Sequence, residues 1–203
     1  MNDPASPRPS MRPRPGRPKA TSQDDLAEAA CELFLEQGYP ATSISDIARR
    51  AGVSRSSFFN YFDSKSAILW SGLDARIEGC LRELATNDDS DAASVTRRAI
   101  TGIARGFNPD YLALAWRNAS AMGILDEVER EAAVRQSRLA HAIAARLRGA
   151  GAESIWAEVR GAAWAATVFA ALRAWSASGA VATDLSELVT EAIGAVEPDV
   201  PPR

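Results

Sequence analysis

The segment 54–62 carries polar side chains whose types and spacing suit hydrogen bonds to the edges of nucleic-acid bases. At 100° per residue of an α-helix, these side chains point away from the face that holds Phe58 and Phe62. They are Arg55, at the leading end of the segment, Ser56, Ser57 and Asn60. Arginine can bond bidentately to guanine and asparagine to adenine, so the segment can specify a DNA sequence.

A second group of polar side chains around this segment suits phosphate oxygens. Ser57 and Tyr61 carry hydroxyls within the segment, and Thr42 and Ser43 stand where the preceding helix is expected to begin. Lys65 adds a cation just after it. Phosphate contacts position a protein on DNA without reading its sequence. We therefore expect this group to orient the base-reading residues.

Two short helices joined by a tight turn are needed to position these residues. The first opens at Ser43, with Asp46 three residues on, a variant of the capping box. Gly52 supplies the backbone freedom that the turn requires, and Ser54 caps a second helix over 55–62. This arrangement is the helix-turn-helix, whose second helix enters the major groove with its N-terminus first.

The rest of the chain is expected to be helical as well. Alanine is abundant, β-branched residues are sparse, and apolar residues recur with helical spacing. The fold class predicted is all-α, a three-helix head followed by a helical domain. The helices expected besides the two above cover 22–37, 65–85, 91–106, 127–147, 155–177 and 185–196, and one more begins at 108–109.

Three stretches of the first third of the chain together resemble the DNA-binding head of the TetR family. They are CELFLEQGY at 31–39, ISDIA at 44–48 and FFNYFDSK at 58–65. The resemblance extends over 26–69 and implies a homodimer of all-helical subunits. It also implies that a ligand of the C-terminal domain changes the spacing of two DNA-reading heads, which in most members releases the operator.

Carried over by position, the family's DNA contacts fall on nine residues. They are Thr42, Ser43, Ser45, Arg55, Ser56, Ser57, Asn60, Tyr61 and Lys65. The chain departs from the family at Phe59, where many members have a tyrosine whose hydroxyl touches phosphate. Phenylalanine has no such hydroxyl, and packing of its ring against a sugar is the alternative. The stretch 58–65, together with 68–70 and 73–74, also resembles a sub-branch that includes mycofactocin-system regulators. That likeness implies an acyl-thioester or other fatty ligand.

The first 20 residues are rich in proline and basic, with five arginines and lysines against one aspartate. Proline lacks an N–H and fixes φ, so we expect a disordered basic arm. Arg14, Arg17 and Lys19 resemble the core of an AT-hook, which lies in the minor groove, although Pro15 replaces the core's first arginine. The alternative is a solvated tail with only a general attraction to DNA.

The C-terminal domain contains bulky side chains beside alanines and glycines, which suggests a ligand pocket. We expect Trp116, Met122 and Trp164 to line it, and Arg117 or Arg138 to meet an acidic ligand group. For each of them alone, ordinary core packing or a solvated charge is the alternative. The expected partners are therefore a small-molecule effector, a palindromic DNA operator and a second subunit.

The helix expected over 155–177 has a single charged residue, Arg173, between 161 and 175. A helix that is apolar all round must be covered on several sides, so we expect another subunit to cover part of it. The interface residues predicted on this basis are Trp164, Val168, Leu172, Trp175, Leu185, Leu188 and Ile193. The alternative is a core helix of a monomer.

Other classes of protein are less well supported by the sequence. The only histidine, His141, lies in a helical pattern without a catalytic motif, so we expect no enzyme, metal or cofactor. A passive helical carrier of lipids would leave the head unexplained. The two cysteines make no disulfide framework, and no apolar run is long enough for a membrane span, so we expect a cytoplasmic protein.

Three parts are predicted: an arm at 1–20, a DNA-binding head at 21–80 and a domain for ligand binding and dimerisation at 81–203.

Overall fold

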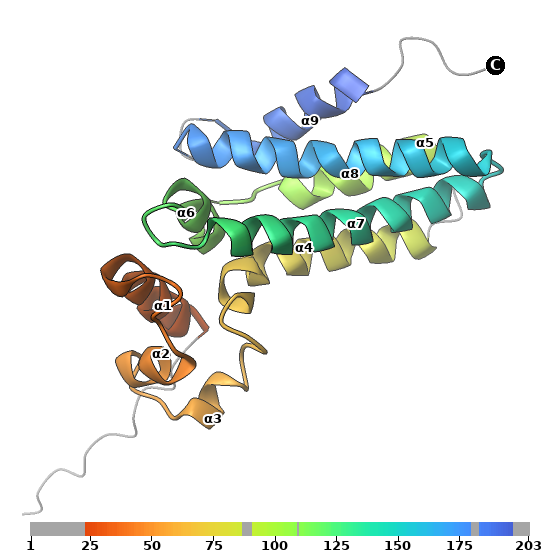
Figure 1. Ribbon diagram of the computed structural model, residues 1–203. Helices are drawn as coiled ribbons and strands as arrows, with labels where there is room; N and C mark the ends of the chain where they lie inside the picture. Colours follow the sequence, from red (N-terminus) through yellow and green to blue (C-terminus); the bar gives the residue numbers. More distant parts are fainter. Residues whose placement is uncertain (1–22, 87–90, 109, 180–182, 197–203) are drawn as a thin grey trace, which may run out of the picture.

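The computed structural model describes residues 23–86, 91–108, 110–179 and 183–196, in which all regular structure is α-helical (Figure 1). This confirms the predicted fold class. The arm residues Arg14, Arg17 and Lys19 lie outside the described residues. Residues 23–66, called the head, contain three helices; residues 67–196, called the body, contain six. The helices are α1 (Gln23–Gln37), α2 (Ile44–Arg50), α3 (Arg55–Phe58), α4 (Ala67–Thr86), α5 (Ala92–Ala104), α6 (Tyr111–Arg117), α7 (Leu125–Gly149), α8 (Ser154–Ala177) and α9 (Leu185–Val196).

The head contributes buried apolar residues to a core that continues into the body. Leu26 and Phe34 of α1 are fully buried, as the helical spacing predicts. Ile47 from α2 and Phe58 from α3 are buried with them, while Phe62 follows α3 and is also buried. The aromatic backing that the sequence places behind the polar face of α3 is therefore present.

The helix α3 is shorter than the sequence predicts, because it ends at Phe58 and not at 62. Beyond Phe58 the chain tightens into turns, in which Asn60 N donates to Ser57 O at 3.2 Å and Tyr61 N donates to Phe58 O at 3.0 Å. The next helix, α4, begins at Ala67 and not at 65. Ahead of it, the Ser64 hydroxyl accepts the Ala67 N–H at 3.1 Å and Leu69 N donates to Ser66 O at 3.0 Å, so the chain enters α4 through a tight turn.

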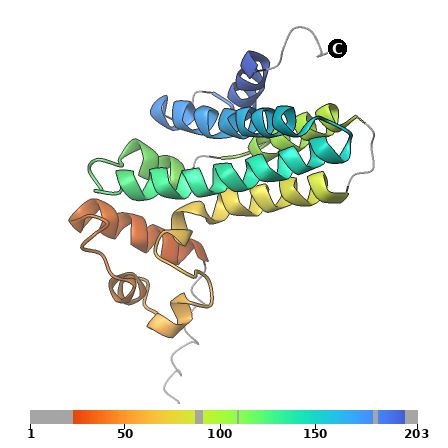
Figure 2. The same ribbon diagram turned by 45° about the vertical axis from the view of Figure 1, so that its right-hand side comes forward.

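The body is a bundle in which α4 runs out of the head alongside α7, and α8 packs on the other side of α7 (Figure 2). Gly161 allows a close approach of α7 and α8, because a Cβ there would lie 2.6 Å from Ala140 O and 3.0 Å from Ala144 N. α9 covers α8 in turn. Trp175 of α8 donates its indole N–H to Thr183 O, just before α9, at 2.9 Å.

The predicted dimer-interface residues pack mostly within their own subunit, because the apolar side of α8 faces the body's own core, and their role at an interface stays a prediction. Helices α5, α6, α7 and α9 all contact α8 within one subunit. As a result six of the predicted residues are buried in their own chain and one, Leu188, is half-buried. The six buried ones are Trp164, Val168, Leu172, Trp175, Leu185 and Ile193.

Candidate nucleic-acid interface

Two serine caps hold the short helices α2 and α3 in place. Ser43 accepts the Asp46 N–H, and the Asp46 carboxylate accepts the Ser43 N–H, each at 3.1 Å, so the predicted capping box is present. These contacts with Ser43, and a bond from Arg49, lower the pKa of Asp46. Ser54 accepts the Ser57 N–H at 3.0 Å, and Gly52 between the helices has a φ of +73°. The turn therefore has the geometry that the sequence predicts.

The base-reading residues predicted from the sequence lie at the exposed surface of α3 and the turn after it. Arg55, Ser56 and Asn60 are exposed, and Ser57 is half-buried. Tyr61 is also exposed. In Figures 1 and 2, α3 lies at the end of the molecule farthest from α9, so the body does not cover this face. The structure thus brings these residues together on one accessible surface.

The charges beside this surface are distributed unevenly. Arg50 of α2 bridges back to α1, with Nη2 at 2.6 Å from Glu36 and Nη1 at 3.0 Å from Glu32. Arg49 pairs with Asp46 at 2.6 Å. Among the residues that the structure describes, Arg55 makes no ion pair, and its guanidinium lies 5.8 Å from the centre of the Phe59 ring. Arg55 is therefore available to an external acceptor.

Two predicted phosphate contacts have other roles in the structure. Thr42 is only 2% exposed, and its hydroxyl donates to the backbone oxygens of Gly38 and Leu33, so in this structure it serves the fold of the head and its contact with phosphate stays a prediction. The Lys65 ammonium donates to Tyr39 O at 2.5 Å and to Thr42 O at 2.8 Å. Two of its three N–H groups therefore serve the head itself, and burial lowers its pKa. The remaining predicted contacts near α2, Ser43 and Ser45, are exposed.

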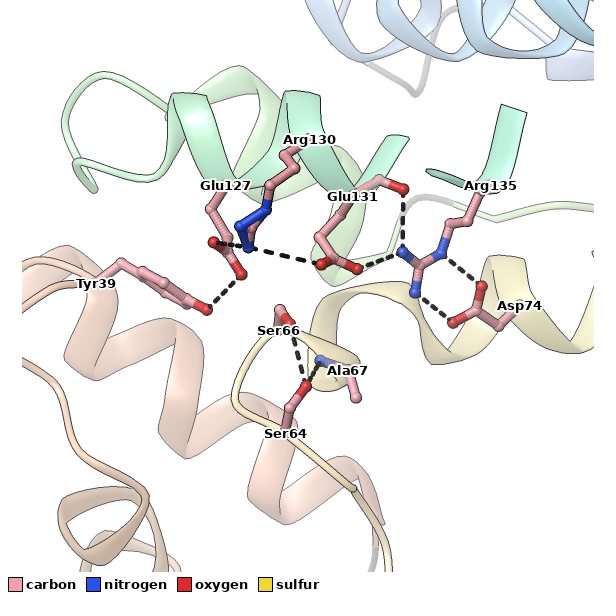
Figure 3. A network of polar contacts seen from close by, with 9 residues as sticks. All are labelled: Tyr39, Ser64, Ser66, Ala67, Asp74, Glu127, Arg130, Glu131 and Arg135. Atoms are coloured by element: carbon pink, nitrogen blue, oxygen red, sulfur yellow. Dashed lines mark hydrogen bonds and ion pairs between the residues drawn. The ribbon is translucent and has the colours of Figure 1, made fainter. Parts of the chain in front are cut away.

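Tyr39 fastens the head to the body. Its backbone N–H donates to Met122 O in the loop before α7 at 2.7 Å, and its hydroxyl donates to Glu127 of α7 at 3.3 Å (Figure 3). The Lys65 ammonium lies 3.8 Å from the centre of the Tyr39 ring. Burial, followed by the charge of Glu127, raises the pKa of Tyr39. The hydroxyl is therefore a donor at any physiological pH.

Arg135 of α7 makes a second connection, to the helix that carries the head. Its guanidinium donates to both carboxylate oxygens of Asp74 of α4, at 2.6 and 2.7 Å, and to the Glu131 carboxylate at 2.6 Å (Figure 3). It also stacks on the ring of Trp70, with 4.3 Å between the guanidinium carbon and the ring centre. If α7 shifts along α4, these contacts must either break or keep their residues moving together. Sequence patterns did not single out Tyr39, Glu127 or Arg135, because their partners are distant in sequence.

Four of the predicted ligand residues do not form one site in the structure. Trp116 of α6 donates to Glu129 at 3.3 Å and lies under Arg173 of α8. Trp164 is buried nine residues earlier on α8, about 13 Å along the helix axis. Met122 is buried in the loop that holds Tyr39, and Arg117 is exposed. Their role in ligand binding stays a prediction.

The described residues were also compared with what a metal site, a membrane span or a nucleophilic cysteine would require. In 23–86, 91–108, 110–179 and 183–196, no group of three or more histidine, cysteine, aspartate or glutamate residues is placed to hold a metal. His141 is exposed on α7, with the Ser137 hydroxyl 3.4 Å from its Nδ1. None of the helices described there has the length and apolarity to cross a bilayer. Burial raises the pKa of the Cys31 and Cys80 thiols to about 12, so neither is a nucleophile at neutral pH.

Residues 26–70, from α1 to the start of α4, match the family model described as "Bacterial regulatory proteins, tetR family". The head of this chain belongs to the TetR family. The match spans the exposed α3 surface and the two caps that position it. The family assignment made from the three sequence stretches is thereby confirmed.

Curated TetR-family relatives share part of their length with this chain. The provisionally named mycofactocin biosynthesis transcriptional regulator MftR of Mycobacterium tuberculosis is 34% identical over 98 residues, which are 47% of this chain and 46% of that protein. The regulator TcmR of Streptomyces glaucescens is 31% identical over 62% of this chain and 60% of its own. The chain thus spans about half the length of these relatives. Both are named as transcriptional regulators, in agreement with the expectation that the chain is not an enzyme.

Solved structures extend the likeness to the body. The TetR-family repressor FadR of Thermus thermophilus, solved in complex with lauroyl-CoA, superposes with a TM-score of 0.50 at 24% identity. The superposition covers 90% of this chain and all of that one. It shows that head and body together have the TetR-family fold.

Proposed function

We propose that this TetR-family chain is a transcriptional regulator that binds duplex DNA through α3 and responds to a small molecule bound by the body. One observation carries the proposal: Arg55 and Ser56 of α3 and Asn60 of the turn after it are all exposed, while Phe58 anchors the segment in the core. An arginine with no ion pair in the described residues and an asparagine at this position can bond guanine and adenine edges.

The test is operator binding by the full-length chain and its Arg55→Ala variant. We expect the wild type to shift a duplex from the region upstream of its own gene, with an affinity that falls steeply as salt rises. Arg55→Ala should lower specific affinity by about 1–3 kcal/mol and relax the base preference at one position per half-site. Loss of non-specific affinity alone, with the preference intact, would contradict the role of Arg55.

A matched control for the loss of charge is Arg98→Ala on α5. Arg98 is exposed and pairs with Glu83 of α4 at 2.7 Å, on the body and away from α3. This variant should bind the operator as the wild type does. If Arg98→Ala and Arg55→Ala weaken binding equally, the effect is one of net charge and not of base reading.

We further propose that the chain is a homodimer joined through the open face of α8, which replaces the interface residues predicted from the sequence. From 162 to 177 the fully exposed positions of α8 are all alanines, Ala162, Ala170, Ala174 and Ala177, and the apolar Ile155 and Val159 precede them. A helix face turned to water normally carries charged or polar groups. Small residues allow two helices to approach closely, and a two-fold pair matches a palindromic operator.

Ala170→Glu tests this dimer, because it places a carboxylate in the middle of the alanine face. We expect sedimentation to show a monomer and affinity for the two-half-site operator to fall, while circular dichroism stays helical. Ala93→Glu, at an exposed alanine in the first turn of α5, is the control and should stay dimeric. A dimer that survives Ala170→Glu would place the interface elsewhere.

Repression and release by an acyl-type effector are the finer part of the proposal. The support is the sequence likeness to mycofactocin-system regulators, including MftR. Native mass spectrometry of the purified chain, followed by titration of the operator complex with the ligand found, is the test. A saturating ligand that leaves operator affinity unchanged would exclude release, for which we expect a coupling of about 1–3 kcal/mol.

A further inference from the structure

An exposed aromatic ring lies beside the arginine of the DNA-reading face. Phe59, the residue after α3, is 45% exposed, and the Arg55 guanidinium carbon lies 5.8 Å from its ring centre. The ring rests edge-on against buried Phe58, with 5.5 Å between the centres and 82° between the planes. A single exposed apolar side chain is common on protein surfaces. This one is fixed by packing and stands on the face proposed to read DNA.

The spacing of Arg55 and Phe59 matches neighbouring base pairs. The two residues are four apart, and Phe59, the C-cap of α3, keeps a helical backbone conformation, so they lie on the same side of the helix, about 6 Å apart along its axis. Base pairs in B-DNA are spaced about 3.4 Å along each strand. A recognition helix that lies in the major groove with Arg55 on one base therefore carries the Phe59 ring to a base one or two steps away.

The chemistry of the ring limits what it can contact there. A phenyl ring has no donor for a phosphate oxygen, whereas the C5-methyl of thymine is the apolar group that the major groove displays. We propose that Phe59 is a specificity-determining residue that packs on a thymine methyl, within two base pairs of the guanine that Arg55 bonds. The ring also restrains the Arg55 fork through the cation–π contact. This inference rests on the proposed function, because it requires α3 in the major groove.

The experiment separates the methyl group from every other feature of the base. The operator is first selected from random duplexes with the full-length wild-type chain. Each thymine is then replaced in turn by deoxyuridine, which lacks only the C5-methyl and keeps the same base pairing. Affinities are measured for the wild type, for Phe59→Ala and for Leu35→Ala. Leu35 is a 49% exposed side chain on α1 of the head, outside the DNA-reading face.

We expect one thymine per half-site to respond. Its replacement should weaken the wild type about fourfold per half-site, the value of one buried methyl-sized group, and about 16-fold when both half-sites are changed. Phe59→Ala should bind both duplexes equally, and Leu35→Ala should discriminate as the wild type does. The other thymines should give the same result in all three proteins.

The outcomes distinguish failure of the proposed DNA binding from failure of the role proposed for Phe59. If the wild type selects and binds no duplex, the proposed function fails. If it binds an operator but no deoxyuridine weakens it, or if Phe59→Ala keeps the discrimination, DNA binding stands and the role of Phe59 is refuted. Arg55→Ala should relax the base preference at one guanine of each half-site. If no thymine lies within two base pairs of that guanine, the role of Phe59 is refuted as well.

Discussion

Replacing Arg135 by methionine is expected to lower the free energy of unfolding by about 2–3 kcal/mol. Methionine keeps most of the side-chain stem and removes the charge, so the change isolates the guanidinium. The side chain of Arg135 is only 14% exposed, and it bonds Asp74, Glu131 and the face of Trp70 at once. Without it, the Asp74 carboxylate loses its cation, and Glu131 keeps only Arg130, at 3.7 Å (Figure 3).

The magnitude follows from the degree of burial. Removing one partner of a fully buried pair costs about 3–5 kcal/mol, because the remaining charge is left uncompensated. The Asp74 side chain is 40% exposed, so water recovers part of that cost. The lost contact with Trp70 adds about 1 kcal/mol. For a chain of this size the net loss corresponds to a melting temperature about 4–12 °C lower.

The assay is urea unfolding followed by circular dichroism at one fixed protein concentration, since dimerisation makes stability depend on concentration. Arg138→Met is the matched control. It lies three residues later on α7 and also pairs with α4, but its side chain is 57% exposed and its partner Glu78 is 43% exposed. We expect a loss of less than about 1 kcal/mol there. Equal losses in the two variants would refute the argument from burial.

Two further predictions concern buried polar groups. Burial raises the pKa of Asp110, which caps α6, from 3.8 to about 6. The folded chain therefore holds this proton more tightly than the unfolded chain, and the free energy of unfolding should fall by at most about 3 kcal/mol between about pH 4 and pH 6, relative to Asp110→Asn. A difference that stays flat with pH, in urea titrations of both proteins, would contradict this. Thr42→Val should cost about 1 kcal/mol of stability by removing the hydroxyl bonds to Gly38 and Leu33, with no change in the operator affinity of the folded protein at a fixed salt concentration. A loss of operator affinity in a variant that is still folded would mean that this hydroxyl does reach a phosphate.

The local features of the head could be predicted from the sequence because each depends on residues close together in the chain. The Ser43–Asp46 box and the Ser54 cap each join residues three apart, and the turn at Gly52 needs only one residue. Hydrogen bonds at such short range form wherever these residue types occur at that spacing. The polar and buried faces of α3 follow from the same helical period.

The tertiary structure alone decided the features that depend on distant partners. Tyr39 and Glu127 are 88 residues apart, and Asp74 and Arg135 are 61 apart, so no local pattern pairs them. The side of α8 that faces inward was also beyond the sequence, because a helix that is apolar all round has no polar face to mark the outside. Only the packing of α5, α6, α7 and α9 around it shows that Trp164 and Trp175 are core and that the alanines are open. The sequence by itself determined the helices and the chemistry of α3, whereas the contacts between helices determined which surfaces remain for a partner.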